Sequence, residues 1–333
     1  MAVKFTKPEI NVREKLAELD KPSGIAGEAM LRAETPQEQF NLIGAGRRNF
    51  TINGDMKVWQ RGTSFTTTNS SYYFADRWTM GSNVSNLTVS RNTGVAVGPF
   101  PKKNTLRMEA TGASGFDLYQ LYEEWEALSN QTITISFWYK TNVKGVIIRQ
   151  WSTASYDTVP MSEDWSYFTT TFTLGTLVAG ARAANTASFG LWANGGIVSG
   201  DYFEFTNYQL ELGKVATPFE HRSYGEELAL CQRYFEVVAE TSDNNGNRYN
   251  GIAWSVSDLN ICIPFRVTKR ANPTVTISSN GQVYTGTWDS ATGSAVTGTS
   301  KRGCTISIQK SSGYTIKYGY FIRAQAITAS AEL

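Results

Sequence analysis

Hydrolytic chemistry would need paired carboxylates or a histidine with catalytic partners, and the spacing of these residues in this sequence does not indicate such a site. A glycoside hydrolase uses two carboxylates at a set separation, and Asp117, Glu123 and Glu124 are candidates. With 29 acidic residues in the chain, however, a pair of this kind arises by chance. The single histidine, His221, cannot form a Ser-His-Asp arrangement by itself, and the sequence has no phosphate-binding glycine motif. We therefore expect a protein that is not an enzyme.

Aromatic side chains point to a different chemistry, the binding of sugars. An exposed aromatic ring packs on the apolar face of a pyranose, while neighbouring polar groups pair with its hydroxyls. Trp151 and Tyr156 lie in the polar, turn-like stretch WSTASYD, with Arg149 and Asp157 beside them. We expect these four residues to contribute to a carbohydrate site. Most other aromatic residues are expected in the core, including the strand-like Trp78, Phe137, Trp138 and Trp192.

The elements that must position these residues are β-strands. Charged residues make up only 18% of the chain and aromatic residues 13%, and the 29 glycines supply many turns, which is typical of an all-β protein. Residues 201–212, DYFEFTNYQLEL, predict one long strand because apolar residues recur with a period near two. Similar runs from Asn49 onward, separated by turns, predict a two-sheet jelly roll.

A short helix and a second β region are expected after this jelly roll. Ser223 followed by Glu226 is a capping-box pattern, which predicts a helix that ends near Arg233. Residues 236–333 alternate again and predict a smaller sandwich. Within it, Asn280-Gly281 indicates a hairpin between TVTISS and QVYTGTW.

The first 48 residues carry most of the helix signals and few aromatic residues. Short helices of this kind bury little apolar area alone, so we expect an arm that docks on a neighbouring subunit or partner. The sequence thus predicts an all-β chain of two β-sandwich (jelly-roll-like) domains with a short helical N-terminal arm. The expected divisions are residues 1–48 for the arm, 49–222 for the first sandwich, and 223–333 for the linker helix and the smaller C-terminal sandwich.

Several motifs resemble those of one class of proteins. Residues 211–235, ELGKVATPFEHRSYGEELALCQRYF, closely resemble a segment of many bacteriophage virion proteins of the tail fibre or tail appendage type. NGDM-x-x-W-Q-R-G-T-S, a later A-D-R-W, a Q-x-x-E before T-x-S-F-W, and the terminal A-x-A-E-L belong to the same pattern. In those proteins the segment follows a β-sandwich similar to carbohydrate-binding modules. The resemblance therefore implies such a module over residues 49–222.

The resemblance also implies a function. It points to a virion structural protein, made in the host cytoplasm, that is anchored to other virion proteins through residues 1–48 and contributes to attachment to host surface polysaccharide. Because phage fibres are usually threefold, we expect a homotrimer. Related sandwiches often hold a calcium ion, and the ligands implied here are Asp55 and Asp201. Two alternatives stay open: a capsid or collar decoration or adaptor protein with no ligand, and, less favoured, a polysaccharide depolymerase.

Charge and hydropathy argue against other partners. The net charge is only +2 and no basic block is present, so we expect no nucleic-acid partner. No apolar run approaches the roughly 20 residues that a spanning helix needs, so we expect no membrane span.

Overall fold

The structure is a computed structural model of the 333-residue chain. It describes residues 48–68, 73–81, 85–123, 125–150, 154–177, 187–239, 249–278, 280–311, 313–323 and 326–332. The helical arm predicted over residues 1–48 therefore lies outside the described residues, apart from Arg48. None of the described helices has the length and apolar character needed to cross a membrane.

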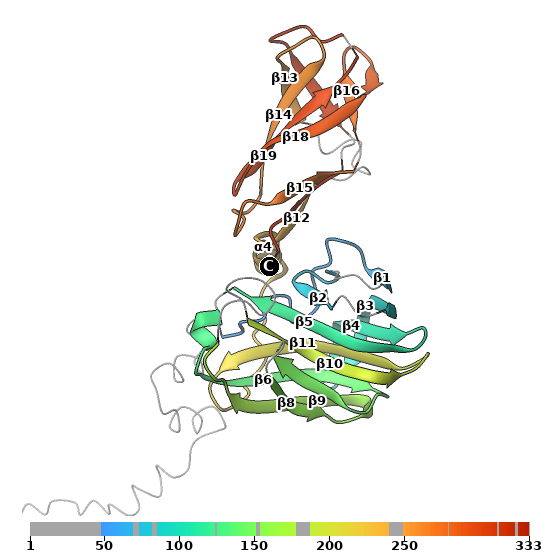
Figure 1. The fold of residues 1–333 in the computed structure, drawn as a ribbon, viewed down its shortest axis with the longest axis vertical. Coiled ribbons are helices and arrows are strands. Elements are labelled where there is room, and N and C mark those ends of the chain that lie inside the picture. Colours follow the sequence, from blue (N-terminus) through green and yellow to red (C-terminus); the bar gives the residue numbers. More distant parts are fainter. Residues whose placement is uncertain are drawn as a thin grey trace, which may run out of the picture.

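Two antiparallel sheets packed face to face form the first sandwich (Figure 1). One has six strands: β1 (Ser64–Thr68), β3 (Ser85–Val97), β4 (Phe100–Ala110), β11 (Tyr202–Leu212), β6 (Thr132–Thr141) and β9 (Ser162–Thr173), in that spatial order. The other has five: β2 (Trp78–Met80), β5 (Ser114–Tyr122), β10 (Ala187–Ile197), β7 (Val146–Gln150) and β8 (Ala154–Val159). A short 3-10 helix, Trp125–Leu128, follows β5.

The predicted long strand is β11, which lies near the middle of the six-stranded sheet. Its inward residues are Phe203 and Phe205, and then Tyr208 and Leu210, so the alternation shifts by one residue. A bulge causes this shift: the ladder with β6 slips between Thr206 and Gln209, and Asn207 has a φ of 54°. The strand therefore buries its apolar residues on one face although its sequence alternates only in part.

The core of the first sandwich is aromatic. Trp78 is fully buried and meets Phe205 and Tyr208 edge-on, at ring distances of 5.3 and 5.2 Å. The expected burial of Trp78 and Phe137 is confirmed. The same expectation was wrong for Trp138 and Trp192, which are half-buried because their side chains lie on the outer faces of the sheets.

The second sandwich also consists of two antiparallel sheets, and the prediction of an all-β chain is confirmed. A three-stranded sheet contains β12 (Phe235–Ala239), β21 (Ile327–Ser330) and β15 (Thr274–Ile277). A seven-stranded sheet contains, in spatial order, β17 (Trp288–Ser290), β16 (Gln282–Tyr284), β20 (Gly319–Arg323), β13 (Tyr249–Ala253), β14 (Asp258–Pro264), β19 (Gly303–Gln309) and β18 (Gly293–Ser300).

The hairpin expected at Asn280-Gly281 does not form. The strand before this turn, β15, pairs with β21 in the three-stranded sheet, whereas β16 after it pairs with β17 and β20. The turn is real, since Gly281 has a φ of 70°, but it carries the chain from one sheet to the other. An Asn-Gly pair predicts that the chain reverses direction locally. It does not predict with which sheet the next strand pairs.

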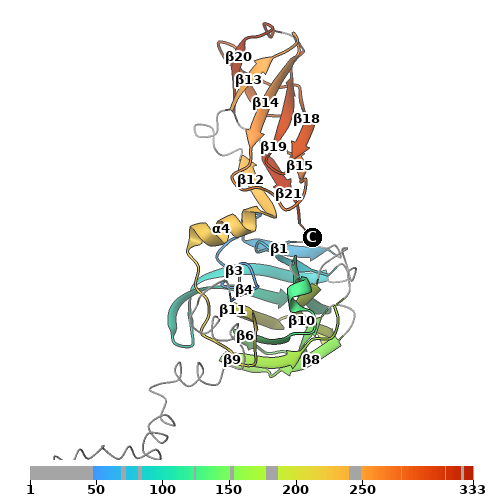
Figure 2. The ribbon, with the colours of Figure 1, turned by 90° about the vertical axis from the view of Figure 1, so that its left-hand side faces the viewer.

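One α-helix, α4 (Tyr224–Gln232), connects the two sandwiches among the residues described (Figure 2). Ser223 caps it as predicted, because its hydroxyl accepts a hydrogen bond from the Glu226 amide at 3.3 Å. Cys231 on this helix is fully buried in a small cluster with Ile52, Val58 and Tyr234. The helix therefore packs on the first sandwich before the chain enters β12.

Candidate functional site

The motifs that carry the resemblance meet in space at the joint between the two sandwiches. Arg77 of A-D-R-W donates to Glu332 of the terminal A-x-A-E-L, with 2.5 Å between Nη1 and Oε2. Arg61, from the W-Q-R-G motif, approaches the other oxygen of Glu332 at 2.9 Å. Both arginines come from the first sandwich, and the carboxylate comes from the end of the second. The two guanidinium groups thus hold one buried carboxylate between them.

Neighbouring side chains of the same motifs extend this network. Gln60 donates to the Asp76 carboxylate at 2.7 Å and to the Phe235 carbonyl at 2.9 Å, so it also bridges the sandwiches. Burial raises the pKa of Asp76, against the opposing influence of the Arg61 guanidinium. Arg61 lies over the Phe235 ring at 3.5 Å. The joint therefore combines ion pairs, hydrogen bonds and cation–π contacts.

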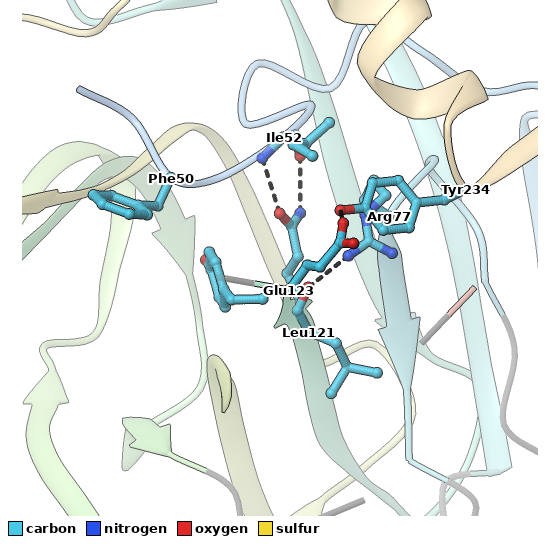
Figure 3. A pocket seen from close by; sticks show the side chains of 8 residues that line it. Phe50, Ile52, Arg77, Leu121, Glu123 and Tyr234 are labelled. Carbon is cyan, nitrogen blue, oxygen red and sulfur yellow. Dashed lines mark hydrogen bonds between the residues drawn. The ribbon is translucent and has the colours of Figure 1, made fainter. Parts of the chain in front are cut away.

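A hollow of about 130 Å³ opens beside this joint (Figure 3). Figure 3 shows the Tyr234 hydroxyl pointing at Glu123, to which it donates at 2.7 Å, and the Arg77 guanidinium donating to the Leu121 carbonyl. Glu123 also pairs with Arg233 at 2.8 Å. Burial opposes the charge on Glu123, but the bonds from Tyr234 and Arg233 lower its pKa overall. The charged groups here are already paired, so we assign this hollow a structural role.

The predicted sugar residues are only partly placed. Trp151 lies outside the described residues, as does the side chain of Tyr156. Arg149 and Asp157 stand on the neighbouring strands β7 and β8, where Asp157 is exposed and opposite Ile148 in the ladder. The Arg149 guanidinium lies over the Trp192 ring at 4.7 Å, on the outer face of the five-stranded sheet. The structure thus joins Arg149 to a tryptophan that the sequence placed in the core, and the four-residue site stays a prediction.

The two carboxylates named for a calcium ion are not brought together. Asp55 is buried and pairs with Lys57 at 2.6 Å, next to Gly54, whose carbonyl accepts from the Tyr208 amide. Asp201 precedes the first residue of β11 and accepts from the Val198 amide at 2.9 Å. The length of strand between these points is about 20 Å. Within the described ranges, no three His, Cys, Asp or Glu side chains are grouped so as to hold a metal ion.

An exposed aromatic surface lies on the second sandwich, where the sequence predicted no site. Trp254 is 71% exposed, Phe321 50% and Tyr284 42%. We define the aromatic surface as these three residues together with Ile252 and Trp288.

The strand register explains why these residues share one face. Tyr284 stands opposite both Trp288 and Phe321, and the rings of Tyr284 and Trp288 are 5.3 Å apart. Ile252 stands opposite Gly319 on the neighbouring strand pair. Directly opposed residues of antiparallel strands point to the same side. A continuous aromatic row therefore crosses β17, β16 and β20. Trp254, two residues after Ile252, continues the same face just beyond the end of β13.

Neutral polar groups border the aromatic surface. Asn250 is exposed and directly opposite Phe321, and Asn260 is directly opposite Ile252. Amide side chains donate and accept hydrogen bonds without carrying charge. Trp254 lies in WSVSD, a polar stretch like the WSTASYD that the sequence argument chose, so the same criterion would have found it.

Comparisons with known proteins give structural similarities only. No protein-family model matches the chain, and no curated protein matches it. It is similar to the tandem CBM22-1–CBM22-2 domain of Paenibacillus barcinonensis Xyn10C, with 10% identity, a TM-score of 0.29, and coverage of 82% of this chain and 100% of that one. It is similar to TmCBM61, solved with beta-1,4-galactotriose, at 12% identity and a TM-score of 0.31, over 50% of this chain and 100% of that one.

A phage protein is also among the similar structures. The enzymatically active domain of tailspike protein 4 from Bacteriophage CBA120 is 12% identical with a TM-score of 0.31, over 49% of this chain and 21% of that one. At these identities and TM-scores, neither the fold nor the function of this chain is inferred from the similarities. The fold rests on the strand pairing and the cores described above.

Proposed function

We propose that this protein is a non-enzymatic attachment protein of a bacteriophage virion, and that it binds host-surface glycans through the aromatic surface of its second sandwich. The observation that carries the proposal is the exposure of Trp254, Tyr284 and Phe321 on one face. Monomeric soluble proteins rarely expose contiguous apolar patches of this kind unless the patch contacts something.

The chemistry of the aromatic surface favours a sugar. A pyranose presents C–H groups on its faces and hydroxyls on its edge, and flat aromatic rings contact the C–H groups at little conformational cost. Asn250 and Asn260 are placed to pair with the hydroxyls. A few stacked sugars give roughly millimolar to micromolar affinity. Several copies of the site would raise avidity by a factor of roughly 10² or more.

The assembly part of the proposal rests on the resemblance and on residues 1–48. We propose that this segment anchors the protein to other virion proteins and that the chain is a homotrimer, so that three aromatic surfaces act together. Light scattering should then give three times the chain mass of 36.8 kDa. A monomeric mass at all concentrations would contradict the trimer.

The proposal is tested on a glycan array with the full-length chain. Trp254→Ala and Phe321→Ala should each reduce binding to the selected glycans by about tenfold or more, because each removes a stacking face. Tyr167→Ala is the matched control, since Tyr167 is an exposed tyrosine of the first sandwich, 46% accessible. Equal binding by all four proteins would contradict a glycan site on the second sandwich.

The alternative of a decoration or adaptor protein without a ligand is favoured by exposed aliphatic residues of the second sandwich. Ile252, Val256 and Ile316 are 63%, 58% and 49% exposed, and aliphatic side chains suit protein contacts better than sugars. Binding of no glycan by the wild-type chain, together with a capsid or collar position in the particle, would favour this alternative. Release of reducing ends from host polysaccharide would instead favour a depolymerase.

A further inference from the structure

A second hollow lies between the sandwiches, distinct from the one beside Glu123. It is open to solvent and has a volume of about 480 Å³, within the range of small-ligand sites. Its walls come from the first sandwich, from α4 and from β12 with the loop after β14. The polar and aromatic residues that line it and carry the argument are Lys57, Arg91, Tyr224, Gln232 and Arg266. We call it the interdomain hollow.

All the described charged residues that line the interdomain hollow are positive. Lys57, Arg91 and Arg266 line it, and no Asp or Glu is among the described residues that do so. Two of these cations already have partners outside the lining: Lys57 pairs with Asp55 at 2.6 Å, and Arg266 with Glu236 at 3.4 Å. The free positive charge is therefore that of Arg91.

Arg91 is held in place without a partner for its charge. It follows Leu87 and Val89 on the face of β3 that points to the core, and it stands opposite the buried Leu106. Its guanidinium forms no hydrogen bond or ion pair with any residue that the structure describes, and its Nε is shielded from solvent. An unpaired, partly desolvated guanidinium is costly, and a carboxylate of a ligand would satisfy it with charge-assisted bonds.

Two further side chains give the hollow the character of a sugar site. Gln232 is only 6% exposed and lines the hollow, and its side-chain amide can both donate and accept hydrogen bonds. Tyr224, at the start of α4, is 58% exposed and offers a ring for stacking. A guanidinium, an amide and an aromatic ring match a pyranose that carries a carboxylate.

We propose that the interdomain hollow binds one acidic sugar residue of the uronic acid class, with its carboxylate on Arg91, a hydroxyl on Gln232 and its ring against Tyr224. This inference rests on the proposed function and specifies it further: the host polysaccharide is acidic, and the protein contacts it at the hollow as well as at the aromatic surface.

The test is a titration of the full-length chain with D-glucuronate, D-glucose and inorganic phosphate, followed by calorimetry or NMR. Glucuronate should bind at least tenfold more tightly than glucose, and its affinity should fall as salt is added. Arg91→Gln should weaken glucuronate binding about tenfold, and Arg91→Lys, which keeps the charge, should weaken it less. Arg302→Gln is the control, because Arg302 is an exposed arginine in a turn of the second sandwich.

Three results would overturn the inference. These are equal affinity for glucuronate and glucose, an unchanged affinity in Arg91→Gln, and phosphate binding as tight as glucuronate with no effect of Tyr224→Ala, which would mark a simple anion site. The two proposals fail separately. If Trp254→Ala abolishes binding on the glycan array while Arg91→Gln leaves binding to acidic and neutral glycans unchanged, the proposed function stands and the acidic-sugar site is wrong.

Discussion

The contact between Arg77 and Glu332 joins residues 255 positions apart. The Arg77 side chain is 1% exposed and that of Glu332 7%, so both charges are desolvated. Burial opposes the charge of Arg77, but the Glu332 carboxylate raises the pKa of the guanidinium above its ordinary value overall. A buried pair of this kind adds little net stability relative to an apolar pair, but each charge depends on the other.

Removing Glu332 should therefore be costly. Glu332→Ala leaves the buried Arg77 guanidinium with the Leu121 carbonyl as its one hydrogen-bond acceptor among the described residues, beside the Tyr234 ring at 3.6 Å. We expect this change to lower the free energy of unfolding by about 3 kcal/mol. Chemical denaturation measures this change. Glu109→Gln is the control, because Glu109 pairs with Arg107 at 2.8 Å but is 47% exposed, and such a pair is worth about 0–1 kcal/mol. Equal stability of the two variants would show that the joint does not depend on this pair.

The residues of the joint could be recognised in the sequence as motifs, but their contacts could not be predicted from it. A-D-R-W, W-Q-R-G and A-x-A-E-L were noted as recurring motifs, yet nothing along the chain says that Arg77 and Glu332 touch. The exposure of Phe321 is similar, since strand-like neighbours predict burial and only the register reveals an outward face. Residue type and local period predict the strands, whereas pairs distant in sequence depend on how the sheets assemble.

At the scale of elements, the hairpin of β16 and β17 supports half of the aromatic row. Tyr284 and Trp288 face each other across its turn, and Asp289 follows them. The Asp289 carboxylate accepts from Lys310 Nζ at 2.8 Å and from the Thr285 hydroxyl. The bond from Lys310 is the main cause that lowers the pKa of Asp289 to about 2. One carboxylate thus ties the hairpin to the chain after β19.

This lowered pKa has a definite sign for stability. The carboxylate is charged in the folded chain down to about pH 2, but an unfolded Asp takes up its proton near pH 3.9. Its contribution is therefore present above about pH 4 and is lost as the pH falls towards 2. Asp289→Asn should lower the melting temperature at pH 6, and the gap to the wild type should close by pH 2. A gap that is constant over this range would contradict the role of the Asp289–Lys310 pair.

Strands and helices were predictable where the signal lies within the element itself. The long strand β11 and the Ser223 cap of α4 were both expected and are present. The hairpin at Asn280-Gly281 was wrong because β15 finds β21, a strand some fifty residues further along the chain, and not its neighbour β16. Local turn chemistry cannot choose between such partners.

At the scale of the whole molecule, the second sandwich stands on the side of the first where β1 lies, with α4 beside the joint (Figure 2). The strands β13, β16 and β20, which carry most of the aromatic surface, lie at the end of the second sandwich away from the first (Figure 1 for β13 and β16, Figure 2 for β13 and β20). The contacts of Arg61 and Arg77 with Glu332 thus join the first sandwich to a second one whose aromatic surface lies far from the first. The sequence predicted two sandwiches but placed the sugar site on the first, because Trp151 and Tyr156 satisfied a local criterion that Trp254 satisfies equally.

The central claim is that glycans are held by the aromatic surface of the second sandwich. A crystal structure of the full-length chain with an oligosaccharide selected on the array tests it most directly. The account predicts a sugar ring packed on Trp254, Tyr284 or Phe321, with hydroxyls bonded to Asn250 or Asn260. A sugar bound instead on the outer face of the five-stranded sheet, against Trp192 and Arg149, with the aromatic surface empty, would contradict it.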